Sequence, residues 1–527
     1  MRLLRAHIVE ATTCGGLLDG LDFQFRTPSL IENVFDPLCL IGSNGSGKSQ
    51  FLQLIAEIFL SAWHQYSPDE EAADANSSVL FEIEYLIWLA EGSPTQVRLS
   101  RLRQGQRKPS ITMQVLEDGE WRILSGAETN YLPSLIVGYT SGGNETLSLP
   151  FAISRMEYAE RVGRQAKDSG EVTSTPIPNT RSLLIDYTTH LEVLVANLLL
   201  GSSTLERTLL SEPQLKELRS FRCTVQLAHS AAPTGGIQLT EELEGHLENL
   251  KRCATCWQFK EDAKSYIFDF YVSDEIQSAF RHYWQDSLTL YRSLHKLAML
   301  NDLALPRYVQ QAFKRDVAKR RFATRMPEPA DLDKVFRFER VTFRKGTSLQ
   351  PVDYVSLSDG EHQLVQVLGT LAMVGDANAL FLLDEPESHF NPQWRVKFVQ
   401  KILDVPTIAG PRKNWSDASR QELFLTTHAP FVPSDMSRDN ILVFSKNFKG
   451  NIEIRRPDIE TFGTTFDRIL EHCFLVTPPI SKVALAEINT LLASDDQSEI
   501  EQGLGRLGAS VEKTYVAQHL RKLKNTG

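Results

Sequence analysis

Residues 42–49 form a glycine-rich loop of a kind that can hold phosphate groups. The segment fits the pattern G-x-x-x-x-G-K-[ST]. Its members are Gly42, Ser43, Asn44, Gly45, Ser46, Gly47, Lys48 and Ser49. The glycines let successive backbone N–H groups point at phosphate oxygens, and the helix that is expected to begin here adds its dipole. We expect Lys48 to reach the β and γ phosphates of ATP and Ser49 to ligate Mg²⁺.

A second candidate site follows a run of apolar residues. Residues 379–383 are all apolar, as expected for a parallel strand that is buried on both faces, and Asp384 and Glu385 come directly after them. Two carboxylates at a strand end are costly without a cation, which favours a metal-binding role over a solvated acidic cap. The arrangement resembles that of P-loop ATPases of the ABC class. This resemblance implies that Asp384 supports Mg²⁺ and that Glu385 polarises the attacking water.

Two more segments resemble motifs of the ABC class. Residues 357–363 resemble the signature motif in its SMC-like and RecF-like variant, which implies that Ser358 and Gly360 cap the γ-phosphate of ATP held by a second copy. Residues 424–430 resemble the switch-histidine strand, which implies that His428 hydrogen-bonds the γ-phosphate. Residues 385–392 match the Glu-Pro-Glu-x-His-x-x-Pro continuation of RecF-like and OLD-like ATPases, at the D-loop position. A metal-binding role for His389 is the less favoured alternative.

One position departs from the ABC pattern. ABC proteins usually place a glutamine near the end of a strand beside the β-meander, where it touches Mg²⁺ and the attacking water. Here that place holds residues 138–144, and the candidates to substitute for the glutamine are Thr140, Ser141 and Asn144. The departure predicts hydrolysis that is slow or tuned by a partner.

The patterns around these motifs predict an α/β fold, namely an ABC-type P-loop ATPase domain with an antiparallel β-subdomain and a large helical insertion. Alternation with a period of two from residue 79 to about 125 indicates an antiparallel meander. Helical periodicity dominates residues 151–333. We therefore predict an N-terminal ATPase lobe at 1–150, a helical insertion at 151–333, a C-terminal ATPase lobe at 334–475 and a helical tail at 476–527.

Two less formal segments resemble a narrower family. Residues 139–145 and 460–467, with the early P-loop and the long insertion, look like the PtuA ATPase subunit of Septu antiphage systems, which also occurs in tripartite retrons. The resemblance implies an ATPase that assembles with an HNH nuclease subunit, and in retrons also with a reverse transcriptase and its RNA–DNA hybrid. The sequence itself holds no Asp-x-Asp pair of the Toprim kind after His428 and no His-Asn-His spacing. The cutting residues are therefore expected on another chain.

The composition is that of a globular chain. Of the 527 residues, 42% are hydrophobic and 23% are charged, which suffices for a large core. No stretch approaches about 18 uninterrupted apolar residues, so we expect a cytoplasmic protein without a membrane partner. The net charge of −10 argues against nucleic acid over the whole surface and leaves room for a local basic face. Six scattered cysteines predict reduced thiols.

Two weaker signals lie in the predicted insertion. Cys253 and Cys256 form a single C-x-x-C pair, which favours plain thiols over a zinc site because two further ligands, such as Cys223 or His246, would be needed. Residues 314–321 are rich in Lys and Arg. A solvated helix face is the favoured interpretation of this run, and a contact with a phosphate backbone is the alternative.

Three functions compete at this point. The first is an ATP-hydrolysing subunit that forms a homodimer, or a higher even oligomer, head to tail around two nucleotides and regulates a bound nuclease. The second is a DNA-repair ATPase of the RecF or SMC type that binds DNA directly, although the insertion lacks sustained heptads. The third is a nucleotide-locked scaffold with negligible turnover, which the missing glutamine keeps open.

Overall fold

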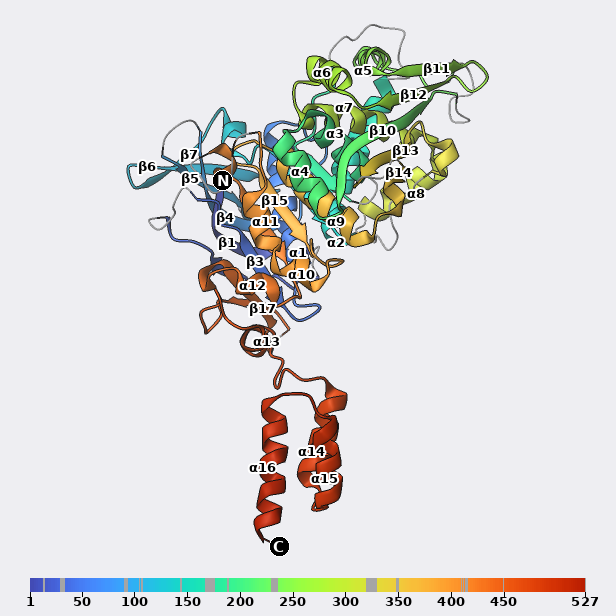
Figure 1. Cartoon of the computed structure of the whole chain (residues 1–527). Coiled ribbons are helices and arrows are strands. Elements are labelled where there is room, and N and C mark those ends of the chain that lie inside the picture. Colours follow the sequence, from blue (N-terminus) through green and yellow to red (C-terminus); the bar gives the residue numbers. More distant parts are fainter. Residues whose placement is uncertain are drawn as a thin grey trace. The chain divides into compact units, whose positions relative to one another are not determined.

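The fold is a computed structural model that describes residues 1–527 except 13–14, 29–33, 90–92, 104, 106–107, 143–144, 166–175, 187–188, 229–235, 319–328, 347–349, 409, 411, 413–415, 449 and 527. The chain divides into two compact units, Met1–Phe462 and Gly463–Gly527 (Figure 1). The division into four parts that the sequence suggested stays a prediction.

A seven-stranded sheet forms the centre of the first unit. The strand order is β18-β17-β3-β16-β15-β8-β9, and all neighbouring pairs are parallel except β17 and β18. The strands are β3 (Leu38–Gly42), β8 (Ile136–Thr140), β9 (Ser182–Ile185), β15 (Leu380–Asp384), β16 (Glu422–Thr426), β17 (Ile441–Lys446) and β18 (Ile452–Arg455). Parallel strands end at one edge of a sheet, and in open α/β sheets ligands bind at that edge.

The predicted meander is a second, antiparallel sheet of six strands in the order β2-β1-β4-β5-β6-β7. Its strands are β1 (Arg2–Glu10), β2 (Asp22–Gln24), β4 (Leu80–Ile87), β5 (Thr95–Arg101), β6 (Ile111–Glu117) and β7 (Glu120–Ile123). Helix α1 (Lys48–Tyr66) packs against both sheets, because Phe51 contacts Phe424 of β16 and Phe59 contacts Tyr85 of β4. This double contact explains why α1 is apolar on most of its surface.

The predicted insertion contains helices together with antiparallel strands that the sequence analysis missed, and two strands that follow residue 333 complete their sheet. The sheet order is β11-β12-β10-β13-β14. Its strands are β10 (Leu215–Gln226), β11 (Cys256–Lys260), β12 (Ser265–Tyr271), β13 (Phe336–Lys345) and β14 (Pro351–Asp353). The helices are α2 (Glu145–Gln165), α3 (His190–Leu200), α4 (Ser203–Ser211), α5 (Glu241–Cys253), α6 (Asp274–Trp284), α7 (Ser287–Met299) and α8 (Arg307–Ala318).

The missed strands and an interruption of the helical pattern in the predicted insertion have local causes. The register of β10 against β13 shifts at three points, so its apolar residues do not alternate with a period of two. The helical periodicity at 279–297 is interrupted between α6 and α7. There Gln285 has a φ of 49°, and the Asp286 side chain accepts a hydrogen bond from the backbone N–H of Thr289 to begin the next helix.

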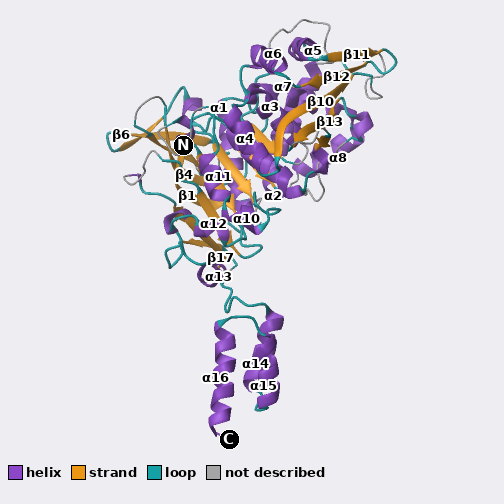
Figure 2. Cartoon of the chain, viewed as in Figure 1, coloured by secondary structure: helices purple, strands orange, loops and turns teal. Residues whose placement is uncertain are grey.

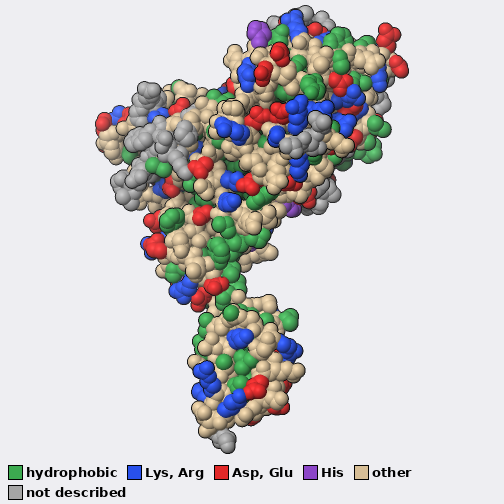
Figure 3. Space-filling view, viewed as in Figure 1, with side chains coloured by type: hydrophobic (Ala, Val, Ile, Leu, Met, Phe, Trp, Pro, Cys, Tyr) green, Lys and Arg blue, Asp and Glu red, His purple; other side chains and the backbone are tan. Residues whose placement is uncertain are grey.

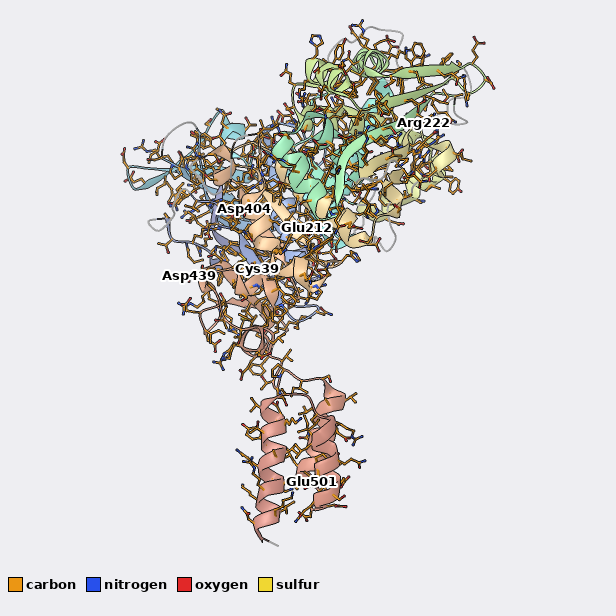
Figure 4. The ribbon with its side chains drawn as sticks, viewed as in Figure 1. Cys39, Glu212, Arg222, Asp404, Asp439 and Glu501 are labelled. Atoms are coloured by element: carbon orange, nitrogen blue, oxygen red, sulfur yellow. The ribbon has the colours of Figure 1, made fainter. Side chains whose placement is uncertain are left out.

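The insertion is anchored on the helix that follows the predicted signature motif. In the first unit the remaining helices are α9 (Asp359–Met373), α10 (Pro392–Val396), α11 (Phe398–Asp404) and α12 (Phe431–Ser434). Asn197 Nδ2 on α3 donates to the carbonyl oxygen of Gly369 on α9 at 3.0 Å. Glu212, labelled in Figure 4, pairs with Lys401 of α11 at 2.8 Å. A movement of the insertion would therefore displace α9.

The second unit is helical (Figure 2). Its helices are α13 (Phe466–Phe474), α14 (Lys482–Ala493), α15 (Gln497–Arg506) and α16 (Val511–Thr526). Helices α14, α15 and α16 enclose a small apolar core of Ile488, Leu491, Ile500, Val516 and Leu520. Within the described parts of both units, no helix combines the length and the apolar character that crossing a membrane requires.

Candidate nucleotide-binding site

The glycine-rich loop joins the end of β3 to the start of α1. Gly42, Gly45 and Gly47 have φ values of 144°, 73° and 92°, which side chains disfavour. A Cβ on Gly42 would lie 2.3 Å from the carbonyl oxygen of Phe444 in the neighbouring β17. The loop can therefore take this path only with glycine at its first position. Its tip, residues 43–45, is exposed.

Lys48 lies across this loop rather than pointing into solvent. Its Nζ donates to the carbonyl oxygens of Gly42 at 3.0 Å and Ser43 at 3.2 Å, and the residue is buried. Burial lowers the pKa of Lys48, while the nearby carboxylates of Glu385 and Asp384 act in the opposite direction. The ammonium group is thus held between the loop and the acidic strand end.

Asp384 brings together three segments that are distant in sequence. Its Oδ1 accepts from Ser49 Oγ at 3.0 Å and from Thr426 Oγ1 at 2.6 Å. Asp384 is only 3% exposed, and burial raises the pKa of its carboxyl. A buried carboxylate beside a serine hydroxyl offers the oxygen ligands that Mg²⁺ takes, so these two residues fit the predicted metal site.

Glu385 and His428 face each other at the ends of β15 and β16. His428 Nε2 lies 3.3 Å from Glu385 Oε1, and both side chains are partly exposed. The hydrogen bond from His428 lowers the pKa of Glu385. Glu385 has a φ of 50°, and its backbone N–H donates to Thr426 Oγ1 at 2.9 Å, which holds this uncommon conformation. The carboxylate is thus ionised and open to solvent beside the buried Asp384.

The strand end that carries His428 is fastened by a buried glutamate. Thr427 Oγ1 donates to Glu387 Oε1 and accepts from the backbone N–H of Ala429 at 2.9 Å. Glu387 is 2% exposed, and burial raises its pKa to about 7. The backbone N–H of Thr427 also donates to Leu40 of β3 at 3.1 Å. His428 is therefore presented by a rigid turn.

Ser358 and Gly360 lie at the start of α9. The Ser358 side chain forms a capping box with Glu361, and Ser358 is exposed. Gly360 is buried, and a Cβ at this position would lie 2.7 Å from the carbonyl oxygen of His389. Gln363 bonds the same segment, where its Nε2 donates to Ser388 Oγ at 3.1 Å. Among the described residues no hydrogen bond joins Ser358 or Gly360 to the P-loop.

The segment expected to replace the missing glutamine ends beside Asp384. Thr140 is the partner of Asp384 in the parallel pairing of β8 with β15, and it is buried. Its hydroxyl donates to the carbonyl oxygen of Gly142 at 2.8 Å. Ser141 follows it and is partly exposed, whereas Asn144 lies outside the described residues. Thr140 and Ser141 stay the described candidates for the glutamine's role.

The weaker signals lie away from this site. Cys253 is buried at the end of α5, Cys256 is exposed on β11, and no cluster of three or more potential metal-ligating side chains occurs in the described part of the chain. His389 is exposed. In the basic run, residues 314–318 belong to α8, and Lys319, Arg320 and Arg321 lie outside the described residues.

Three exposed arginines of the sheet formed by β10 to β14 are paired with acids. Arg222, labelled in Figure 4, contacts Asp269 at 2.7 Å. Arg340 contacts Asp353 at 3.2 Å, and Arg344 contacts Glu217 at 2.8 Å. Figure 3 shows acidic and basic side chains interspersed on the visible face of the insertion. These three pairs do not form a one-sign surface for a phosphate backbone.

Sequence reasoning gave no role to several residues that build the site. Thr426 bridges Asp384 and Glu385, Glu387 holds Thr427, and Gln363 ties α9 to the segment after Glu385. The available signal was their position, because Thr426 ends a buried strand and Glu387 sits inside the matched continuation. Only the packing of the strands shows what each one touches.

Comparison with known proteins matches part of the chain to a described family. The family described as "AAA domain, putative AbiEii toxin, Type IV TA system" matches residues 243–435, which include Ser358, Asp384, Glu385 and His428. A solved structure described as "Structure of the recombination mediator protein RecF-ATPrS in RecFOR pathway" is 12% identical, covers 86% of this chain and 97% of its own, and has a TM-score of 0.28. Among curated proteins nothing matches.

The matched segment contains the acidic strand end, and the hydrogen bond between Ser49 and Asp384 joins this strand end to the glycine-rich loop. The first unit is an α/β fold with the parallel sheet, loop and acidic strand end of a P-loop ATPase.

Proposed function

We propose that the chain binds ATP with Mg²⁺ at this site and hydrolyses it. One observation carries the proposal: the 3.0 Å hydrogen bond between Ser49 Oγ and Asp384 Oδ1 joins the P-loop to the acidic strand end across 335 positions. The two oxygens lie close enough together to ligate a single Mg²⁺ ion beside the bound phosphates. The buried carboxylate of Asp384 gains a charge partner when the cation binds.

Each residue of the site then has a defined task. The backbone N–H groups of residues 42–49 cradle the phosphates, and Lys48 leaves its two carbonyl partners to reach the β and γ oxygens. Bound Mg²⁺ would neutralise charge on these oxygens. Glu385, which is ionised, accepts a proton from the attacking water. His428 donates toward the γ-phosphate and so reports its presence.

The same proposal requires a second copy of the chain. Ser358 is exposed at the N-terminus of a long helix and does not bond to its own P-loop. It would therefore cap, together with Gly360, the γ-phosphate held by a partner. A homodimer, or a higher even oligomer, would form head to tail around two ATP molecules and open after hydrolysis.

In the cell, we place the chain in an antiphage defence complex as the ATPase subunit that regulates an HNH nuclease. The resemblance of residues 139–145 and 460–467 to the Septu and retron ATPase supports this role. The description of the matched family as a toxin of a type IV toxin–antitoxin system also suits a defence function. In a retron setting, a reverse transcriptase and its RNA–DNA hybrid would join the complex.

The purified full-length chain tests the enzymatic part of this proposal. Wild-type protein with Mg²⁺ and ATP should release phosphate, and Glu385→Gln should lower the rate about hundredfold or more while ATP still binds, because it removes the general base. Glu244→Gln on the exposed face of α5 is the matched control and should change nothing. No release by wild type would favour the nucleotide-locked scaffold. Unchanged turnover in Glu385→Gln would show that another group is the base.

The DNA-repair alternative differs in what stimulates turnover. A RecF-type or SMC-type enzyme would respond to DNA alone, whereas a nuclease-regulating subunit would respond to its partner chain. Phosphate release is therefore measured with duplex DNA and, separately, with the HNH nuclease that the proposal assigns to the chain as its partner. Stimulation by DNA alone would favour the alternative.

A further inference from the structure

Lys446 is a cation beside the P-loop that no motif includes. Lys446 is the last residue of β17. Phe444 of the same strand pairs with Gly42 of β3, so Lys446 lies level with the tip of the loop. Its Nζ lies 3.9 Å from the position that a Cβ on Gly45 would take. Lys446 is exposed, and within the described residues it forms no ion pair.

The hairpin that carries Lys446 is fixed against the loop. In β18, Ile452 is paired with Lys446, and its Cγ1 lies 2.9 Å from the position of a Cβ on Gly47. The backbone N–H of Ile452 also donates to the carbonyl oxygen of Leu17 at 3.2 Å. The base of the Lys446 side chain is thus held in place, and its charge stays near the exposed tip.

The signature segment carries an opposite charge, that of Asp359. Asp359 directly follows Ser358 and is exposed. The neighbouring acid, Glu361, is already engaged, since its Oε2 accepts from Ser358 N at 2.7 Å and from Ser358 Oγ at 2.8 Å. Among the described residues Asp359 makes neither a hydrogen bond nor an ion pair. Of the two acids, Asp359 is the one available to another molecule.

The two charges would interact when Ser358 of one copy approaches the triphosphate that a second copy holds. A carboxylate on the next residue would approach the same anionic group and repel it, unless a cation at the receiving loop compensates. Lys446 lies beside the tip of that loop. This compensation by Lys446 requires the head-to-tail dimer and therefore rests on the proposed function.

We infer that Lys446 of one copy forms an ion pair with Asp359 of a second copy in the ATP-bound dimer. The pair sets the register of the two copies and offsets the repulsion between Asp359 and the bound nucleotide. Lys446 is a positioning residue in this inference, since it acts on the partner's signature segment.

A charge-swap experiment on the full chain tests the pair. All variants carry Glu385→Gln to preserve ATP, and the dimer dissociation constant is measured with Mg²⁺ and ATP by analytical ultracentrifugation. Lys446→Asp and Asp359→Lys should each weaken the dimer about tenfold or more, and the double variant should recover most of that loss. High salt should reduce the difference between the Glu385→Gln parent and the single charge variants.

Matched controls separate the pair from general charge effects. Glu241→Lys reverses the corresponding first-turn acid of α5, which also follows an N-cap residue, and Lys482→Asp reverses an exposed lysine of the second unit. Neither should change the dimer. ATP binding by each variant at a concentration where the chain is monomeric shows whether its own pocket is intact.

The outcomes distinguish the pair from the proposed function. Single variants that dimerise like the parent, or a double variant that recovers nothing, overturn the pair alone. If Lys446→Asp loses ATP binding as a monomer, Lys446 contacts phosphate in its own pocket, and the pair is overturned. If the Glu385→Gln parent binds ATP yet stays monomeric, the head-to-tail dimer fails, and the pair fails with it.

Discussion

At the scale of single residues, Asp384 and Glu385 are neighbours with opposite environments. Asp384 is buried, and its pKa is raised by that burial, whereas Glu385 is partly exposed, and its pKa is lowered by the hydrogen bond from His428. The first therefore suits a metal ion that replaces water, and the second suits a base that must be ionised and reach water. Thr426 Oγ1 donates to the carboxylate of Asp384 and accepts from the backbone N–H of Glu385, which fixes the backbone between the two acids.

The contact between His428 and Glu385 makes the pH profile of hydrolysis informative. His428→Ala removes the hydrogen bond that lowers the pKa of Glu385, so this pKa should rise. A base must be ionised to act, so the acid limb of kcat/KM against pH should move to higher pH. His428→Gln keeps a donor, and its limb should move less. An acid limb that stays in place in His428→Ala would show that the imidazole does not tune Glu385.

Residue identities were predictable where one local pattern carries them. The spacing of residues 42–49 and the two acids after an apolar run indicated phosphate and metal chemistry directly from the sequence. Thr426, Glu387 and Lys446 were not predictable in this way. Their roles depend on which strands are neighbours in the sheet, and β3 and β17 come from opposite ends of the first unit.

At the scale of elements, the site is built from the ends of four parallel strands. β3 supplies the P-loop, β15 the two acids, β16 the threonine and histidine, and β8 the segment at Thr140. The apolar run at residues 379–383 predicted β15, because strands buried on both faces need continuous apolar residues. Strands β10, β11 and β12 were missed, in part because the register shifts of β10 hide its alternation.

The close approach of β3 and β17 predicts a severe effect of one methyl group. Gly42→Ala places a Cβ 2.3 Å from the Phe444 carbonyl oxygen and strains a φ of 144°. The free energy of unfolding should fall by about 1–3 kcal/mol, and ATP binding should be lost with the loop geometry. Chemical denaturation and nucleotide titration measure both effects.

Gly245→Ala is the control for this substitution. Gly245 lies inside α5 with no atom within 4 Å of the added Cβ. It should be neutral or raise the free energy of unfolding by about 0.5–1 kcal/mol. If Gly42→Ala behaved like Gly245→Ala, the tight packing of the P-loop on β17 would be contradicted.

At the scale of the whole chain, the two compact units have separate cores. All residues of the proposed pocket belong to Met1–Phe462. A chain ended after Phe462 should therefore fold and bind ATP with the affinity of the full chain. Circular dichroism and nucleotide titration of the shortened chain provide the check, and loss of its folding would show that Gly463–Gly527 is needed by the first unit.

The proposed pocket holds Mg²⁺ and ATP at the place where the P-loop and the acidic strand end meet. Equilibrium binding of ATP to the purified chain, with Mg²⁺ and with EDTA, tests it most directly. Wild type should bind more tightly with Mg²⁺, Asp384→Asn should lose that difference, and Lys48→Ala should weaken binding by about tenfold or more, since a charged hydrogen-bond donor is removed. Lys482→Ala should match wild type. Equal ATP affinity in wild type and Lys48→Ala, or an undiminished Mg²⁺ effect in Asp384→Asn, would contradict the claim.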